Sequence, residues 1–132
     1  MRKSKYRGQK VSDGTWVYGS LSLDCNDKPF IRVAGYGADG KAFDSMVEVK
    51  PESVGQFTEV VAKNKPVYEN DIVQYIDEWD FENHRMTEKV VFEEGCFRAG
   101  EGGCELYECD ELVVIGNTSD NPDMEYGFYQ DI

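Results

Sequence analysis

Residues 4–23 read SKYRGQKVSDGTWVYGSLSL, and this stretch indicates the fold class. Two strand-like runs flank Asp13-Gly14. An Asp-Gly pair accepts the positive φ angles that a tight two-residue turn demands. We therefore predict a β-hairpin, with the aliphatic face of its second strand turned to the core.

The next part of the chain repeats this chemistry. Residues 30–50 read FIRVAGYGADGKAFDSMVEVK, and Asp39-Gly40 again separates two strand-like runs. This pattern predicts a second hairpin. The segment PESVGQFTEVV, residues 51–61, has helix-like apolar spacing, but its Gly, Thr and β-branched residues favour a short turn that leads into a strand.

Further strands are predicted towards the C-terminus. Residues 72–76 form one strand, and EKVVFEE and GCFRA, residues 88–94 and 95–99, form the next two. ELVVI, residues 111–115, is predicted to be the most buried strand, because four consecutive apolar residues imply cover on both faces. The tail, residues 124–132, either adds an edge strand or stays loose.

The composition agrees with a chain built mostly of sheet. The 132 residues include two Trp, eight Tyr and seven Phe. Aromatic and β-branched side chains pack well on strands and lose rotamer freedom in helices. A chain of this length fits one domain, or one domain with a small satellite, and can bury a core without metal or disulfide support.

Charge is distributed unevenly along the chain. Residues 1–50 carry nine Lys/Arg against six Asp/Glu, a net charge of +3, and residues 51–132 carry five against twenty, a net charge of −15. The second part would repel a phosphate backbone. Nucleic acid is therefore a disfavoured partner.

A basic strip at the start of the chain is a candidate surface for binding phosphate groups of nucleic acid. Its members are Arg2, Lys3, Lys5, Arg7 and Lys10. The alternative is that these charges protect an edge strand from mispairing, and we favour that interpretation.

Two neighbouring aromatic residues are candidates for partner binding. Trp79 and Phe81 lie in the acidic stretch WDFEN. Rigid aromatic side chains are enriched at interfaces, so they could anchor a protein partner if exposed. A loop folded back on the protein is an equally good interpretation.

The chain shows no membrane or export signal. No apolar run approaches the roughly 20 residues that span a bilayer, and no apolar segment follows the basic start. We expect a cytoplasmic protein, in which Cys25, Cys96, Cys104 and Cys109 remain thiols.

Metal sites are not expected. His84 and the three later cysteines lack the close pairs that form zinc knuckles, so free thiols are the favoured interpretation. Oxygen-bearing side chains alternate at Asn117, Ser119, Asn121 and Asp123. A calcium loop would need Gly where Pro122 stands and Glu where Phe128 stands, so we interpret this cluster as turns that end a strand.

No catalytic arrangement stands out. His84 is the single histidine and lies in the polar stretch FENHRM, where a solvated imidazole is the favoured interpretation. No phosphate-binding Gly-Lys-Ser/Thr loop occurs. We predict no enzymatic activity, no cofactor and no small-molecule substrate.

Four stretches in order resemble the landmarks of the YopX-type phage protein family. They are RKSKYRGQKVSDGTWVYGSL, VKPESVGQFT, KPVYENDIVQY and ELVVIGNTSDNPDM, and together they reach across nearly the whole chain. The resemblance implies a small, largely β phage or prophage protein that acts in the bacterial cytoplasm and has no assigned biochemical activity.

The resemblance assigns structural positions rather than catalytic ones. These positions are Gly55, Thr58, Asp71, Gly116, Asn117, Asn121 and Pro122. The chain departs from the family where Glu59 follows Thr58 in place of Gly. It also has Asn70 before Asp71 where the family has Gly, which is a mild change because Asn tolerates left-handed geometry.

The VYENDIV pattern is also similar to small SH3-like barrels, where an Asp-capped turn admits a strand. We predict a mainly β fold with N-terminal hairpins at residues 1–50, an SH3-like barrel at 51–118 and a C-terminal tail at 119–132.

The predicted function is non-enzymatic, through a protein partner or through self-assembly into a homo-oligomer. The opposite charges of the two parts motivate self-assembly. The alternative is an acidic mimic of DNA that inhibits a host nucleic-acid enzyme.

Overall fold

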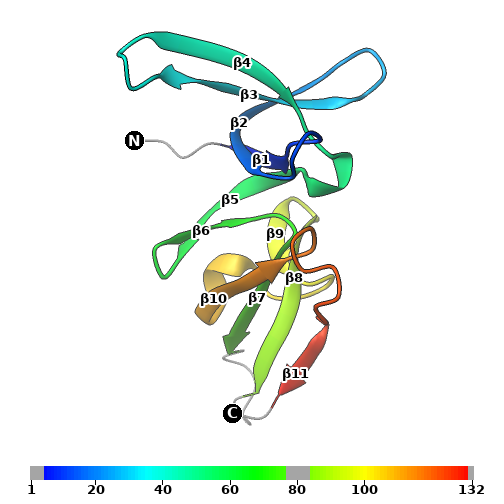
Figure 1. The fold of residues 1–132 in the computed structure, drawn as a ribbon. Helices are drawn as coiled ribbons and strands as arrows, with labels where there is room; N and C mark the ends of the chain where they lie inside the picture. The colour runs from blue at the N-terminus through cyan, green and yellow to red at the C-terminus, as the bar shows by residue number, and fades with distance from the viewer. Residues whose placement is uncertain (1–4, 77–83, 131–132) are drawn as a thin grey trace. The chain divides into compact units, whose positions relative to one another are not determined.

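The computed structural model describes residues 5–76 and 84–130 and consists mainly of antiparallel strands. The strands are β1 (Tyr6–Gln9), β2 (Trp16–Leu23), β3 (Pro29–Tyr36), β4 (Ala42–Glu48), β5 (Gly55–Ala62), β6 (Lys65–Tyr68), β7 (Asp71–Ile76), β8 (Arg85–Glu93), β9 (Cys96–Ala99), β10 (Asp110–Asn117) and β11 (Phe128–Gln130). Two short 3-10 helices, η1 (Pro51–Ser53) and η2 (Leu106–Glu108), complete the elements (Figure 1). No helix within the described ranges has the length and hydrophobicity to cross a membrane.

The chain divides into two compact units. The first comprises residues 1–57 and the second residues 58–132, so the division falls within β5. The start of β5 pairs with β1, and β6 is the hydrogen-bonded neighbour of β5. Each unit is described by itself below.

The first unit contains both predicted hairpins. Antiparallel pairing joins β1 to β2, β2 to β3, and β3 to β4. Gly40, in the turn between β3 and β4, has a φ of 77°, but Gly37 N–H donates to the Lys41 carbonyl, so the loop contains residues 38–40 and is one residue longer than the predicted two-residue turn. Residues 51–61 form the predicted short turn and strand, η1 followed by β5.

Strand β2 changes partners midway. Its first half, Trp16 to Gly19, pairs with β1, and its second half, Ser20 to Leu23, pairs with β3. The change occurs at Gly19, where an added Cβ would overlap the carbonyl oxygen of Arg32. Only glycine permits this close approach of the two backbones.

The second unit holds a sheet with the strand order β10-β7-β8-β11, and β9 pairs with β8 (Figure 1). Its core is a cluster of buried residues: Ala62, Val67, Val73, Tyr75, Val90, Ala99, Leu106 and Leu112. The tail contributes β11, which pairs with β8, so it forms one of the two predicted alternatives, an edge strand.

The prediction that residues 111–115 form the most buried strand is wrong. Strand β10 lies at an edge of its sheet, and Ile115 is 38% exposed. Its pairing with β7 shifts register twice, between Asp110 and Val113 and between Val114 and Gly116. Bulges place successive residues on irregular faces, so a run of apolar residues here does not mean cover on both faces.

Glu59 occupies a conformation that suits glycine. Its φ is 69°, in the left-handed region, within β5. This is the position where the YopX-type pattern has Gly. Glu59 therefore adopts a backbone conformation that glycine favours, at the conformational cost of a side chain.

The fold class is thus mainly β with two antiparallel sheets. The described strands form sheets with free edges, so the SH3-like barrel stays a prediction.

We expect Gly19→Ala to destabilise the protein by about 1–3 kcal/mol, because the added methyl group forces β2 and β3 apart. Urea unfolding followed by circular dichroism measures the change. Gly35→Ala is the matched control, since its Cβ would lie 3.3 Å from the tip of the movable Phe43 ring. Equal stability of the two variants would contradict the proposed role of Gly19.

Candidate protein-interaction surface

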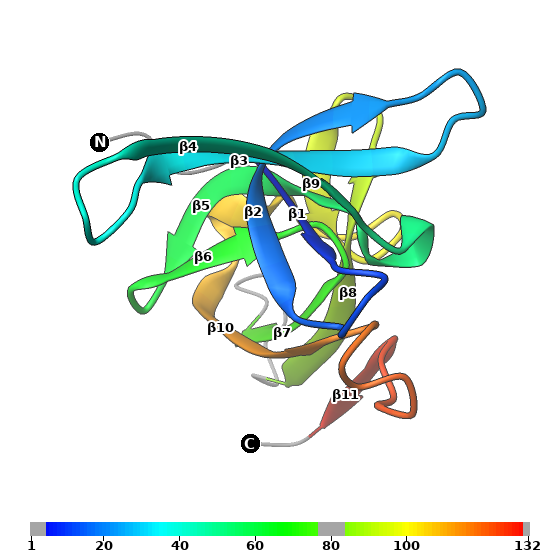
Figure 2. The same cartoon turned by 45° about the horizontal axis from the view of Figure 1, so that its top comes forward.

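Half of the β3–β4 hairpin lacks a third strand. Strand β2 pairs with β3 only from Pro29 to Arg32, whereas β3 and β4 stay paired as far as Tyr36 and Ala42. We call the remaining two-stranded part, residues 33–45, the distal ribbon. It is visible as a long paired extension in two views (Figures 1 and 2).

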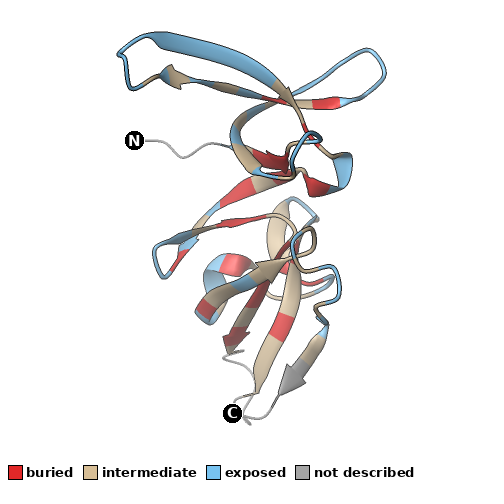
Figure 3. Ribbon diagram, in the orientation of Figure 1, coloured by how far each residue is buried: buried red, intermediate tan, exposed pale blue. Residues whose placement is uncertain are grey.

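Large apolar side chains on this hairpin face solvent. Tyr36 is 80% exposed, Phe43 44% and Met46 52%. The exposed colour covers most of the hairpin in Figure 3. Tyr36 and Met46 lie on one face of the hairpin and Phe43 on the other. A two-stranded ribbon is only marginally stable in water, and a partner that covers its exposed apolar side chains removes them from water. The hairpin is therefore our candidate surface for protein binding.

An ion pair braces the ribbon across its two strands. Arg32 donates from Nε and Nη2 to the two carboxylate oxygens of Asp44, at 2.9 and 2.7 Å. Hydrogen bonding from the Arg32 guanidinium lowers the pKa of Asp44. Both side chains are about half exposed, so the pair fixes geometry more than it stabilises the fold.

The predicted basic strip is not one continuous exposed row. Arg7 is buried, and its guanidinium lies 4.5 Å from the centre of the Trp16 ring. Lys5 is exposed, and Lys10 lies 4.0 Å from Asp13. Arg2 and Lys3 lie outside the described residues, as do the predicted anchors Trp79 and Phe81.

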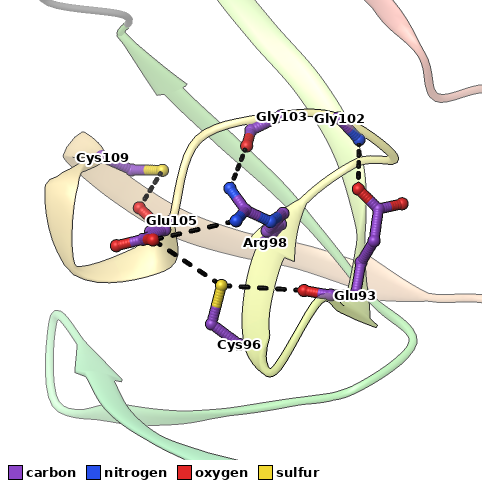
Figure 4. Close-up of polar contacts among 7 residues, drawn as sticks. All are labelled: Glu93, Cys96, Arg98, Gly102, Gly103, Glu105 and Cys109. Carbon is purple, nitrogen blue, oxygen red and sulfur yellow. Dashed lines mark hydrogen bonds and ion pairs between the residues drawn. The ribbon is translucent and has the colours of Figure 1, made fainter.

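Cys96 and Cys109 join a polar network beside η2 (Figure 4). The Cys96 thiol lies 3.7 Å from both the Glu93 carbonyl oxygen and the Glu105 carboxylate. Arg98 approaches the same carboxylate at 3.8 Å and donates to the Gly103 carbonyl oxygen. The network ties the β8–β9 hairpin to the segment that leads into η2.

This network does not prepare a nucleophile. Burial raises the pKa of the Cys96 thiol, which favours the protonated form over the reactive thiolate. Within residues 5–76 and 84–130, no group of three His, Cys, Asp or Glu residues could hold a metal ion. His84 is half-buried immediately before β8, and the four cysteines are not joined by disulfides.

The Asn-rich cluster after β10 bonds to itself. Asn117 Oδ1 accepts the backbone N–H groups of Ser119 and Asp120, at 3.0 and 2.8 Å. Asn121 Oδ1 in turn accepts the N–H of Asn117. These bonds reverse the chain at the end of the strand, and they engage the side-chain oxygens of Asn117 and Asn121.

The other positions of the resembled pattern lie within strands or beside their ends. Thr58 Oγ1 donates to the Val67 carbonyl oxygen, and Asp71 Oδ2 accepts the Tyr68 N–H, both at 2.8 Å. Gly55 is buried at the start of β5. Gly116 packs against Asn121, and Pro122 is exposed beyond it.

Sequence reasoning missed the hairpin surface. Tyr36, Phe43 and Met46 lie in strand-like runs whose sequence does not tell an exposed apolar side chain from a buried one. Their exposure follows from where β2 stops pairing with β3, and no local residue pattern records that limit.

Comparisons with known proteins bear on the fold alone. No family model matches the chain, and no curated protein matches it. A solved structure, the crystal structure of protein EF1440 from Enterococcus faecalis, is similar with a TM-score of 0.54 and 19% sequence identity. The likeness covers 90% of this chain and 95% of that one.

We expect Arg32→Gln to raise the pKa of Asp44 towards the ordinary carboxyl value. At a pH above the ordinary carboxyl pKa, the Arg32–Asp44 pair stabilises the ribbon. This contribution is lost as the pH falls through the lowered pKa of Asp44. NMR titration of the carboxyl carbons measures the pKa of Asp44 in the unchanged protein and in the variant. Asp24 is the internal control, because backbone N–H groups of Lys28 and Asn26 lower its pKa independently of Arg32. An unchanged Asp44 pKa would rule out the pair in solution.

Proposed function

We propose that this chain is a YopX-type phage or prophage accessory protein that acts in the bacterial cytoplasm, without enzymatic activity, by binding proteins. A second copy of the chain is the first partner. The four ordered sequence landmarks support the family assignment. They also support an SH3-like barrel at residues 51–118, where the Asp71 carboxylate caps the turn before β7.

The distal ribbon is the observation that carries the binding role. Its apolar side chains lie on two strands that lack support from a third, so a partner that covers them both removes apolar surface from water and stiffens the ribbon. Exposed single residues elsewhere need no such explanation.

Charge supports a second copy as that partner. The first fifty residues carry +3 and the rest −15, so different parts of two copies attract each other. Such attraction steers association more than it strengthens it, and the apolar hairpin would supply the affinity.

A second candidate function is inhibition of a host nucleic-acid enzyme by mimicry of DNA. It is favoured by the exposed acidic side chains of the second unit: Glu59, Glu94, Glu101, Glu108, Asp110, Glu111, Asp120, Asp123 and Glu125. A surface of this charge attracts proteins that bind phosphate backbones.

We expect the protein to be larger than a monomer by light scattering after size exclusion, and Tyr36→Ser to shift it towards the monomer. Tyr107→Ser is the matched control, because Tyr107 is 73% exposed on the second unit. A monomer at every protein and salt concentration would contradict self-association. An equal shift towards the monomer by both variants would contradict the proposal that the hairpin is the surface of self-association.

For the mimicry function, we expect affinity capture from a host lysate to enrich basic DNA-binding proteins that moderate salt releases. Capture of only neutral or acidic proteins would exclude it. Charge reversal at Glu108 and Glu111 should reduce the capture, and Glu52→Lys on the first unit is the control.

A further inference from the structure

Most sheet edges in the described ranges are protected against strand addition. Strand β6 has four residues and includes Lys65 and Pro66. Strand β10 is bulged and begins with two acidic residues, and β11 has three residues. Short length, charge, proline and bulges are the usual means by which proteins prevent edge-to-edge pairing.

The outer edge of β4 is longer and has neither proline nor a bulge, and its two acidic residues, Asp44 and Glu48, form ion pairs with Arg32 and Lys28. Its seven residues, AFDSMVE, contain no lysine, arginine or proline. Its pairing with β3 runs from Glu48 to Ala42 without a register shift. The strand order ends at β4, and residues 42–46 are all exposed.

The hydrogen bonds at both ends of the hairpin show which backbone groups face this edge. Gly37 N–H donates to the Lys41 carbonyl at 2.8 Å, and Val49 N–H donates to the Pro29 carbonyl at 3.2 Å. Residues of β4 with odd numbers therefore bond to β3, since antiparallel pairs alternate. The N–H and C=O groups of Ala42, Asp44 and Met46 point outward.

The open stretch has a defined end. The outward carbonyl of Glu48 accepts the Val11 N–H at 3.1 Å, so the first unit covers its own edge from that residue onward. Among the residues that the structure describes, the free edge thus extends from Ala42 to Val47.

We propose that two copies of this chain pair through their β4 edges, antiparallel and about a two-fold axis at Ser45. In this register Asp44 exchanges both backbone bonds with Met46 of the partner copy, and Phe43 lies opposite Val47. The inference rests on the self-association proposed above and specifies its interface.

Side-chain chemistry selects the axis. An axis at Asp44 would place two carboxylates directly opposite each other, and an axis at Met46 would place Asp44 opposite Glu48. Like charges in facing positions destabilise a strand pair. An axis at Ser45 avoids both, and it pairs Phe43 with a β-branched residue in the closely spaced, non-hydrogen-bonded positions. Isologous pairing of this kind uses the same surface on both copies.

The register predicts a site-specific crosslink. Residues on the axis have Cα atoms about 4.5 Å apart in a non-hydrogen-bonded pair, which a disulfide can bridge. In a Cys25→Ser background, we expect Ser45→Cys to form a disulfide-linked dimer under mild oxidation. Ser22→Cys is the matched control, an exposed serine on β2 within the sheet, and should stay monomeric on a denaturing, non-reducing gel.

A second pair of variants separates the interface from self-association itself. Ser45→Lys places two ammonium groups across the axis and should raise the dimer dissociation constant several-fold, whereas Ser22→Lys should not. A dimer that neither crosslinks at Ser45 nor weakens with Ser45→Lys overturns the β4 interface and leaves self-association standing. A monomer under all conditions overturns both.

Discussion

The first unit depends on a single close approach, that of Gly19 to the Arg32 carbonyl group. Because no Cβ stands between the two backbones, β2 can leave β1 and continue along β3 without a break. The same step limits how far β2 supports β3. Beyond Arg32 the hairpin continues as two strands alone. The most exposed apolar surface of the first unit is thus a consequence of how one strand is shared.

Local turn chemistry explains how much of the fold could be predicted from the sequence. Asp39-Gly40 marks a reversal whose φ angle is set within two residues, so the hairpin can be recognised without tertiary information. The burial of the strand at residues 111–115 could not be predicted from local sequence in this way. Its burial depends on bulges against β7 and on its place at the sheet edge, which are set by residues far away in sequence.

Side-chain roles on the candidate surface were harder to predict than strands. Arg7 belongs by sequence to a basic strip, yet the structure packs its guanidinium over Trp16. That contact depends on the β1–β2 register, in which Arg7 faces Tyr18 and Gln9 faces Trp16. The strand-like residues on either side of Asp39-Gly40 predict a hairpin equally well whether or not a third strand covers it. The sequence gives the type of each side chain, whereas the strand register determines which side chains it contacts.

The short length of the free β4 edge limits any assembly built on it. Glu48 is already engaged by Val11 on one side, and the reverse turn at Gly40 follows on the other. An added strand would therefore use the outward backbone groups of Asp44 and Met46 and leave only those near Ala42, which are too few to template a third copy. Growth would stop at a closed pair instead of propagating into a fibre. An exposed strand edge is normally an aggregation hazard. Here its length is limited on one side by the bond to Glu48 and on the other by the turn at Gly40.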